Sequence, residues 1–265
     1  MSIHATAVVH KNAVLDSTVT VGAYAVIGEN VSIDAGTEIQ PHAVVSGHTA
    51  IGKRNVIASF TMVGAPPQDI HYRNEPTTVV IGDDNQIREY ASIHRGTAKG
   101  AGVTRIGSGC LLMAYSHVAH DCVVHDQVIM ANAATLGGHV QVGRKATLGG
   151  LVAVHQFSRI GEFAYVGGMS GINKDVPPYV IVGGTRNQIR VAGINKIGLR
   201  RSGFDATAIR DLERAYQIIF RAPDLLLQDA LQKAESEFPD CEPVRTLIRF
   251  FRESKRGVVR RSDDE

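Results

Sequence analysis

Three of the eleven histidines, His120, His139 and His155, recur at nearly regular intervals along the chain. An acidic residue, Asp121, follows the first of them directly. Neutral imidazole is a common zinc ligand, and it is also the side chain whose pKa best suits a general base near neutral pH. Either use requires a fold that brings the three rings to one edge of the molecule.

An aliphatic residue at every sixth position organises about two thirds of the chain. One series runs without a gap from Ile3 to Val63 and resumes from Ile81 to Ile93, and a second series, one residue out of phase, runs from Ile106 to Ile172. Helices repeat near 3.6 residues and strands at 2, so a period of six favours a strand followed by a turn. Three such hexads would form one triangular coil with its aliphatic positions on the axis.

This geometry places the histidines. His120 stands two positions after the axial residue Val118, so we expect it on the outside, with His139 and His155 stacked beyond it in a column of three imidazoles. Asp121 is a neighbour of His120, and neighbours on a regular strand face opposite sides. It can therefore orient that ring only where a corner turns it back. Glycines that follow axial positions, such as Gly22, Gly28 and Gly52, are expected to supply positive φ angles at the corners.

Two detours interrupt the repeat, at 64–80 and 94–105, and loops that project from a rigid solenoid often carry binding groups. The repeat ends near 176–178, and apolar residues then recur at helical spacing, with Asp205 as an expected N-cap. The sequence therefore predicts a mainly β protein, with a parallel β-helix over 1–184 and a C-terminal α-helical domain over 185–265.

Composition excludes several classes of function. The 265 residues carry a net charge of only +2, which argues against nucleic-acid binding. No apolar run is long enough to cross a bilayer, and no signal peptide is visible. The three cysteines form no CxxC pair. We therefore expect a cytoplasmic protein.

Several motifs together give a more specific indication. They are HRGT at 94–97, SHVAHDC at 116–122, GGHV at 137–140, VHQF at 154–157 and DVPPYV at 175–180. In order and spacing, over essentially the whole chain, they resemble those of the UDP-N-acetylglucosamine 3-O-acyltransferases, whose hexapeptide coils are left-handed. The resemblance implies transfer of an (R)-3-hydroxyacyl group from acyl carrier protein to the glucosamine 3-hydroxyl, the first step of lipid A synthesis. It implies His120 as general base, Asp121 as its orienting partner and the Gly138 N–H as oxyanion donor.

The resemblance also implies the substrate contacts. In the first detour Gln68 and Asp69 match sugar-contacting residues reached from an adjacent subunit, and His71 stands where the family commonly has lysine. Further contacts would be His94, His117, His139, His155 and Gln156. Nucleotide diphosphate contacts would be Asn195, Arg200 and Arg201, and the residues that set acyl length would be Gly168 and Met169. The family implies a homotrimer with sites between subunits, no metal and no cofactor beyond the acyl carrier protein thioester.

Four alternatives remain open. The acceptor could be a 3-amino analogue of the sugar nucleotide. The related N-acyltransferases usually carry a domain before the coils, whereas the repeats here begin at Ile3. A metal-dependent hydratase resembling the γ-class carbonic anhydrases would use the His-x4-His spacing of His120 and His125, but no histidine stands at a matching corner upstream. The solenoid could also be a non-catalytic scaffold.

Overall fold

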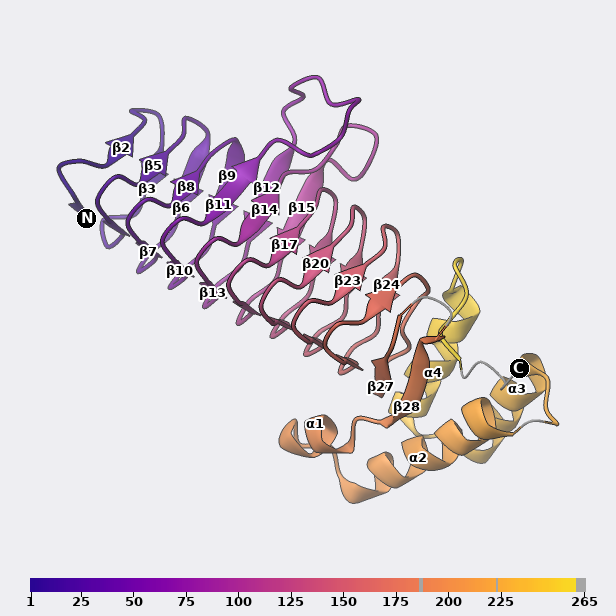
Figure 1. The fold of residues 1–265 in the computed structure, drawn as a ribbon. Coiled ribbons are helices and arrows are strands. Elements are labelled where there is room, and N and C mark those ends of the chain that lie inside the picture. Colours follow the sequence, from indigo (N-terminus) through magenta and orange to yellow (C-terminus); the bar gives the residue numbers. More distant parts are fainter. Residues whose placement is uncertain (186–187, 223, 261–265) are drawn as a thin grey trace.

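The computed structural model describes residues 1–185, 188–222 and 224–260 and contains a parallel β-helix followed by a helical cap. Short strands wind into a triangular rod from the N-terminus, and four helices gather at its far end (Figure 1). Within these residues no helix combines the length and apolar character needed to span a membrane.

Three sheets form the sides of the rod, and their strands are as follows. Sheet A contains β1 (Ser2–Ile3), β4 (Thr20–Val21), β7 (Glu38–Ile39), β10 (Val56–Ile57), β13 (Gln86–Ile87), β16 (Leu111–Leu112), β19 (Ile129–Met130), β22 (Thr147–Leu148), β25 (Tyr165–Val166), β27 (Val180–Gly183) and β28 (Arg190–Ile194). Sheet B contains β2 (Val8–Val9), β5 (Val26–Ile27), β8 (Val44–Val45), β11 (Met62–Ala65), β14 (Ser92–His94), β17 (His117–Val118), β20 (Thr135–Leu136), β23 (Ala153–Val154) and β26 (Gly171–Ile172). Sheet C contains β3 (Val14–Leu15), β6 (Val31–Ile33), β9 (His48–Ile51), β12 (Thr78–Ile81), β15 (Val103–Ile106), β18 (Val123–Val124), β21 (Gln141–Val142) and β24 (Arg159–Ile160).

The strand register confirms the coil of three hexads and explains the change of phase. Ser2 pairs with Thr20, one coil further along. Across the first detour Val56 pairs with Gln86, and across the second Gln86 pairs with Leu111. Compared with the regular coil, the first detour thus adds two whole hexads. The second adds one hexad and a single further residue, which shifts the aliphatic series by one.

The axial aliphatic residues form the core of the rod. From Val21 onward they are buried, and Ile57, Ile87 and Leu136 are fully inaccessible. Ile3 is 41% exposed because it belongs to the first coil, which has no coil beyond it to cover it. The predicted core is confirmed except at this open end.

The expected positive φ is confirmed at Gly64, where φ is 80°, but not at the other glycines that follow axial positions. Gly22 and Gly52 do not have positive φ angles, whereas many non-glycine corner residues do, among them Tyr115 and Asp121. A Cβ at Gly22 would lie 2.7 Å from the Pro41 backbone nitrogen, and one at Gly52 would lie 2.8 Å from the Gly82 carbonyl oxygen. These glycines therefore permit close stacking of successive coils.

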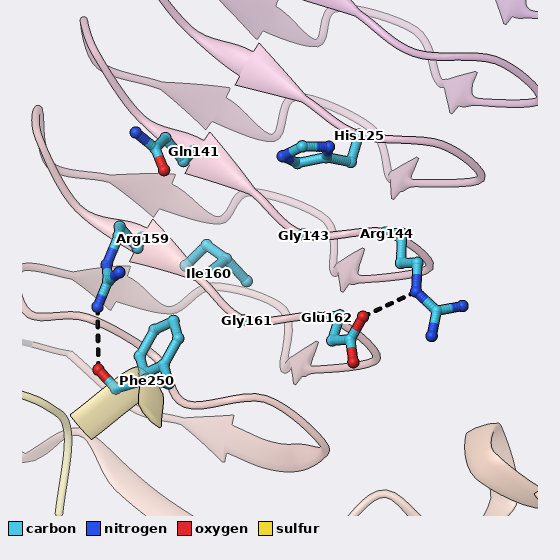
Figure 2. A pocket seen from close by; sticks show the side chains of 9 residues that line it. All are labelled: His125, Gln141, Gly143, Arg144, Arg159, Ile160, Gly161, Glu162 and Phe250. Atoms are coloured by element: carbon cyan, nitrogen blue, oxygen red, sulfur yellow. Dashed lines mark hydrogen bonds and ion pairs between the residues drawn. The ribbon is translucent and has the colours of Figure 1, made fainter. Parts of the chain in front are cut away.

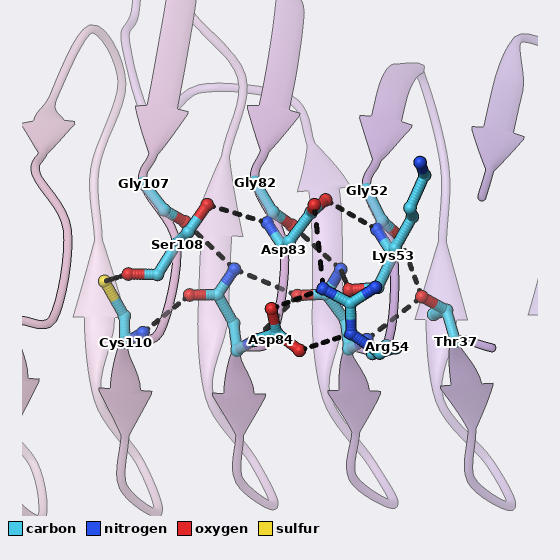
Figure 3. Close-up of polar contacts among 12 residues, drawn as sticks. Thr37, Gly52, Lys53, Arg54, Gly82, Asp83, Asp84, Gly107, Ser108 and Cys110 are labelled. Atoms are coloured by element: carbon cyan, nitrogen blue, oxygen red, sulfur yellow. Dashed lines mark hydrogen bonds and ion pairs between the residues drawn. The ribbon is translucent and has the colours of Figure 1, made fainter. Parts of the chain in front are cut away.

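A line of buried polar side chains joins four coils near the corner between sheets C and A (Figure 3). Asn85 donates from its side chain to Asn55 Oδ1 at 2.9 Å and to the Gly107 carbonyl at 2.9 Å, and its own Oδ1 accepts from the Cys110 N–H at 2.7 Å. Asn55 in turn donates to the Gly82 carbonyl at 2.8 Å. Both amides are completely buried, so their polar atoms depend on these bonds.

The cap consists of α1 (Lys196–Arg201), α2 (Ala206–Arg221), α3 (Leu227–Glu237) and α4 (Glu242–Glu253). It joins the rod through β28, which pairs antiparallel with β27. Asp205 caps α2 as expected, because its side chain accepts from the Ala208 N–H at 2.8 Å. The division of the chain at 184/185 stays a prediction.

Candidate active site

The His120–Asp121 pair lies at the corner between β17 and β18. Asp121 has a φ of +59°, and this left-handed backbone turns its carboxylate back toward the preceding residue. Its Oδ2 lies 2.8 Å from Nδ1 of His120. The corner therefore supplies the turn that a regular strand would not allow.

The second detour surrounds the Asp121 carboxylate with donors. Thr97 donates its backbone N–H at 3.0 Å and its hydroxyl at 2.7 Å to Oδ2, and the Gly102 N–H donates to Oδ1 at 3.1 Å. The side chain is fully inaccessible. Burial alone would raise the pKa of Asp121, but the hydrogen bonds from Thr97 and His120 outweigh it and hold the pKa below its ordinary value. The carboxylate is thus kept charged beside the imidazole.

Gly138 lies directly against the His120 ring, one coil further along. A Cβ at this position would lie 2.5 Å from Cε1 and 2.7 Å from Nε2 of His120. Glycine is therefore the residue that leaves room for the ring. Its N–H donates no hydrogen bond within the described ranges, which leaves this donor free beside the imidazole.

The imidazole column contains two rings instead of three. His139 meets His120 edge to face at 5.1 Å between centroids, and its Nε2 lies 3.8 Å from Asp121 Oδ2. The ring stacked on His139 is Phe157, at 4.4 Å, and not His155. A full coil puts position 157, not 155, above 139, so this part of the prediction is wrong. Burial lowers the pKa of His139 despite the nearby Asp121.

His117 and His94 form a second pair on sheet B. Their rings meet edge to face at 4.9 Å, and His117 Nδ1 lies 2.7 Å from the Ser92 hydroxyl oxygen. Burial, together with the charge of His120, lowers the pKa of His117. Burial also lowers the pKa of His94 to about 4, with His117 next in effect. These rings are therefore neutral near pH 7.

The first detour lies beside the second detour of the same chain. The backbone hydrogen bond from His71, at 2.9 Å, lowers the pKa of Asp69 most, and the charge of His120 adds to the lowering. That Gln68 and Asp69 contact the sugar from an adjacent subunit stays a prediction. Gln68 and the His71 side chain are exposed. Arg95 ties the detours together, because its Nε donates to the Tyr72 hydroxyl at 2.8 Å.

The remaining predicted contacts on the rod lie on neighbouring coils. Gln156 is exposed one coil beyond Gly138, and His155 precedes it. Gly168 and Met169 lie at the opposite edge of sheet B, between β25 and β26. Met169 is 73% exposed, and a Cβ at Gly168 would lie 3.2 Å from the Gly150 carbonyl oxygen.

The predicted nucleotide contacts lie on the cap, beyond the end of the rod, so one chain does not bring them to His120 (Figure 1). Arg200 and Arg201 are exposed on α1. Asn195 is the N-cap of α1. It accepts from the Gly198 N–H at 3.1 Å and donates to the Phe163 carbonyl at 2.9 Å, which gives its side chain a structural role.

A metal site would have to form at the catalytic corner. Within the described ranges His120, Asp121 and His139 are the one group of three whose ligand atoms lie within 4.8 Å of one another. Both Asp121 oxygens already accept hydrogen bonds from Thr97, so a cation would displace them. His125 lies instead in a separate cavity of about 290 Å³ beside sheet C and α4 (Figure 2). The His-x4-His pair of the hydratase alternative therefore does not converge.

Thr97, Gly102 and Phe157 belong to the site but were not predicted. Phe157 could have been found from the period alone, since it stands one full coil after His139. Thr97 and Gly102 lie in a detour where the period no longer applies. Their contact with Asp121 depends on the path of that loop.

Known proteins resemble the whole chain. A family model described as UDP N-acetylglucosamine O-acyltransferase, domain 2, matches residues 175–259, and a model of bacterial transferase hexapeptide repeats matches residues 103–138. The acyl-[acyl-carrier-protein]–UDP-N-acetylglucosamine O-acyltransferase of Syntrophobacter fumaroxidans is 50% identical over 98% of this chain and 100% of its own length. The enzyme of the same name from Halorhodospira halophila is 51% identical over 97% of this chain and 99% of its own.

Solved structures agree. The Acinetobacter baumannii protein superposes with a TM-score of 0.93 at 42% identity, covering 97% of this chain and 99% of its own. The Moraxella catarrhalis UDP-N-acetylglucosamine O-acyltransferase superposes with a TM-score of 0.94 at 41% identity, covering 98% of this chain and all of its own. The predicted left-handed parallel β-helix with a C-terminal helical domain is confirmed. With identity of this degree over nearly its full length, the chain belongs to the UDP-N-acetylglucosamine O-acyltransferase family.

Proposed function

We propose that this acyltransferase moves an (R)-3-hydroxyacyl group from acyl carrier protein to the 3-hydroxyl of UDP-N-acetylglucosamine, the first step of lipid A synthesis. The observation that carries the proposal is the contact of His120 with Asp121 at 2.8 Å on one side and with Gly138 on the other. A base, its orienting carboxylate and a free backbone N–H are the groups that acyl transfer to a hydroxyl requires.

In the proposed reaction His120 uses Nε2, because Asp121 occupies Nδ1. The Nδ1–H donates to Asp121, so Nε2 carries the lone pair and takes the proton of the sugar hydroxyl as the oxygen attacks the thioester carbonyl. The Gly138 N–H donates to the thioester oxygen as negative charge develops on it. The imidazolium then returns its proton to the departing thiolate, and the ester and free thiol are formed. Base catalysis of this kind contributes about 10²–10⁴ in rate.

The site is proposed to be shared between subunits of a homotrimer. Arg200 and Arg201 are exposed on α1 with no ion pair in the described part of the chain, and guanidinium groups suit a diphosphate. Because α1 lies at the helical end of the molecule, away from β17 and the corner that follows it (Figure 1), we assign them to the site of a second copy. Gln68, Asp69, His71, His94, His117, His139, His155 and Gln156 would contact substrate from the rod.

Mixed trimers test the shared site. His120→Ala and Arg201→Ala proteins should each lose most activity alone. Unfolding and refolding them together should restore part of it, because some mixed trimers contain one intact site. Two arginine variants, Arg200→Ala and Arg201→Ala, mixed in the same way are the control and should not recover to the same level. If trimers shown to contain both variants recover no activity, His120 and Arg201 of one site must come from the same chain.

We propose that the reaction uses no metal and that the protein is cytoplasmic. Both Asp121 oxygens already accept hydrogen bonds, so neither is free for a cation, and a preparation treated with chelator should keep its activity. Loss of acyl transfer on chelation, with recovery on adding zinc, would show that the reaction needs a metal and would refute this part of the proposal.

One assay tests the activity itself. Purified protein is given acyl carrier protein thioesters of graded chain length with either UDP-N-acetylglucosamine or its 3-amino analogue. We expect transfer to the hydroxyl acceptor, with a preferred length set at Gly168 and Met169. Preference for the amine would identify the other acceptor. No transfer to either, from folded protein, would refute the proposed function.

A further inference from the structure

The segment that follows α4 returns to the rod and is fixed there by Asp175. This carboxylate is 2% exposed, and it accepts from the Arg159 N–H at 2.8 Å and from the Ser254 hydroxyl at 2.9 Å. The backbone of Asp175 also bridges the segment, accepting from the Val259 N–H at 2.8 Å and donating to the Gly257 carbonyl at 3.0 Å. Residues 254–259 are therefore held at both ends.

Arg159 also binds the end of α4 to the rod. Its guanidinium lies 3.1 Å from Asp175 Oδ2 and donates to the Phe250 carbonyl at 3.0 Å, as Figure 2 shows for the second of these bonds. It also lies over the Phe250 ring at 4.3 Å. The end of α4 and the segment beyond it thus have a defined position on the rod.

From this segment Arg256 extends to His155. Its Nη2 lies 3.2 Å from Nδ1 of His155 and 3.4 Å from the Asn173 carbonyl oxygen. The same Nδ1 lies 3.0 Å from the carbonyl oxygen of Gln156. One ring nitrogen therefore has two neighbours of opposite character.

These two neighbours require different tautomers of the neutral ring. A guanidinium can only donate, so it needs a lone pair on Nδ1, whereas a carbonyl can only accept and needs a proton there. With Arg256 bound to Nδ1, the proton lies on Nε2, which can then act as a donor. Without Arg256, the Gln156 carbonyl would hold the proton on Nδ1, and Nε2 would become an acceptor.

We infer that Arg256 is a positioning residue that selects the Nε2–H tautomer of His155, so that this histidine donates a hydrogen bond to a substrate oxygen. The inference rests on the proposed function only in taking His155 as a substrate contact. It gives the C-terminal segment a role in the site, although Arg256 and His155 lie far apart in the sequence.

Nitrogen NMR of the free trimer, labelled with ¹⁵N-histidine, tests the tautomer without any substrate. At a pH where His155 is neutral, identified by its loss in His155→Ala, the wild-type ring should show Nδ1 unprotonated. Arg256→Ala should shift the proton to Nδ1, and Lys255→Ala, which removes the adjacent exposed cation, should not. An unchanged tautomer in Arg256→Ala overturns the inference.

Kinetics give the second readout. Arg256→Ala should raise KM for one substrate about three- to tenfold, the value of one hydrogen bond, with kcat changed less. In His155→Ala, the further change Arg256→Ala should add nothing, since Arg256 acts through that ring. Additive losses would show a merely structural role. If the wild-type protein transfers no acyl group, the proposed function fails, while the NMR result still decides the tautomer.

Discussion

Replacement of Asp121 by asparagine tests how the His120 tautomer is set. Oδ1 of Asp121 faces two backbone N–H groups, of Thr97 and Gly102, at 3.2 and 3.1 Å. The Thr97 N–H is shared with Oδ2, at 3.0 Å, whereas the Gly102 N–H faces Oδ1 alone. An amide therefore loses fewer hydrogen bonds with its oxygen at the Oδ1 position, because an NH₂ group there would oppose both donors. Its nitrogen then takes the place of Oδ2, 2.8 Å from His120 Nδ1 and 2.7 Å from the Thr97 hydroxyl, which can rotate to accept.

The amide nitrogen can only donate, so it forces His120 to accept at Nδ1 and to carry its proton on Nε2. The lone pair that should take the sugar proton is then absent. A base in the wrong tautomer should lose most of its contribution, and we expect kcat in Asp121→Asn to fall about 10²–10⁴-fold. KM should change little, because the ring stays in place.

The assay is steady-state acyl transfer at pH 8 with matched thermal melts of both proteins. Asp126→Asn is the control, since that exposed carboxylate also accepts a backbone N–H, from Ser108 at 2.7 Å, but belongs to the next corner, between β18 and β19, and not to the corner of His120. A folded Asp121→Asn protein that keeps more than a tenth of wild-type kcat would refute this account of the pair.

Three further outcomes are expected. Gly138→Ala should fold but lose at least 10²-fold in kcat, since its Cβ would lie 2.5 Å from His120 Cε1; a variant with normal kcat would contradict this contact. Asn85→Ala should lower the free energy of unfolding in urea by about 3 kcal/mol because it leaves buried groups unpaired. Asp84→Ala is the control and should cost clearly less, because the ion pair that it removes, with Arg54, is exposed; equal losses would contradict the importance given to burial. The free energy of unfolding should decrease as pH falls from 6.5, because unfolded His94 takes up a proton that the folded ring, with its pKa of about 4, does not. The loss by pH 5.5 is about 1 kcal/mol, and thermal melts across this range should show a smaller loss in His94→Gln.

The repeat could be predicted closely because it is a local pattern with one dominant cause. Burial of an aliphatic residue at every sixth position dictates the coil, and even the phase change at Ile106 follows from the single odd residue that the second detour adds. The reason for glycine at positions 22 and 52 could not be predicted. Close contact between coils, such as Gly22 against Pro41, is a property of the stacked rod and not of its period.

The site could be predicted in part. His120, Asp121 and Gly138 meet because they occupy fixed places in successive coils. The prediction for His155 is wrong because its interval from His139 is slightly short of a full coil, and this difference places His155 directly after strand β23 and not at the corner position above His139. The contacts of Thr97 with Asp121 and of Arg256 with His155 join loops to the rod, and no periodicity governs loops.

The Asp121 carboxylate orients His120, and it also fastens the second detour through Thr97 and Gly102. A related protein without acyl transfer activity would still need a hydrogen-bond acceptor at position 121 to hold the second detour in place, whereas position 120 could be occupied by other residues. A hydrogen-bond acceptor at this corner, aspartate or asparagine, therefore reports on the architecture of a relative, whereas histidine followed by aspartate reports on whether that relative is still an enzyme.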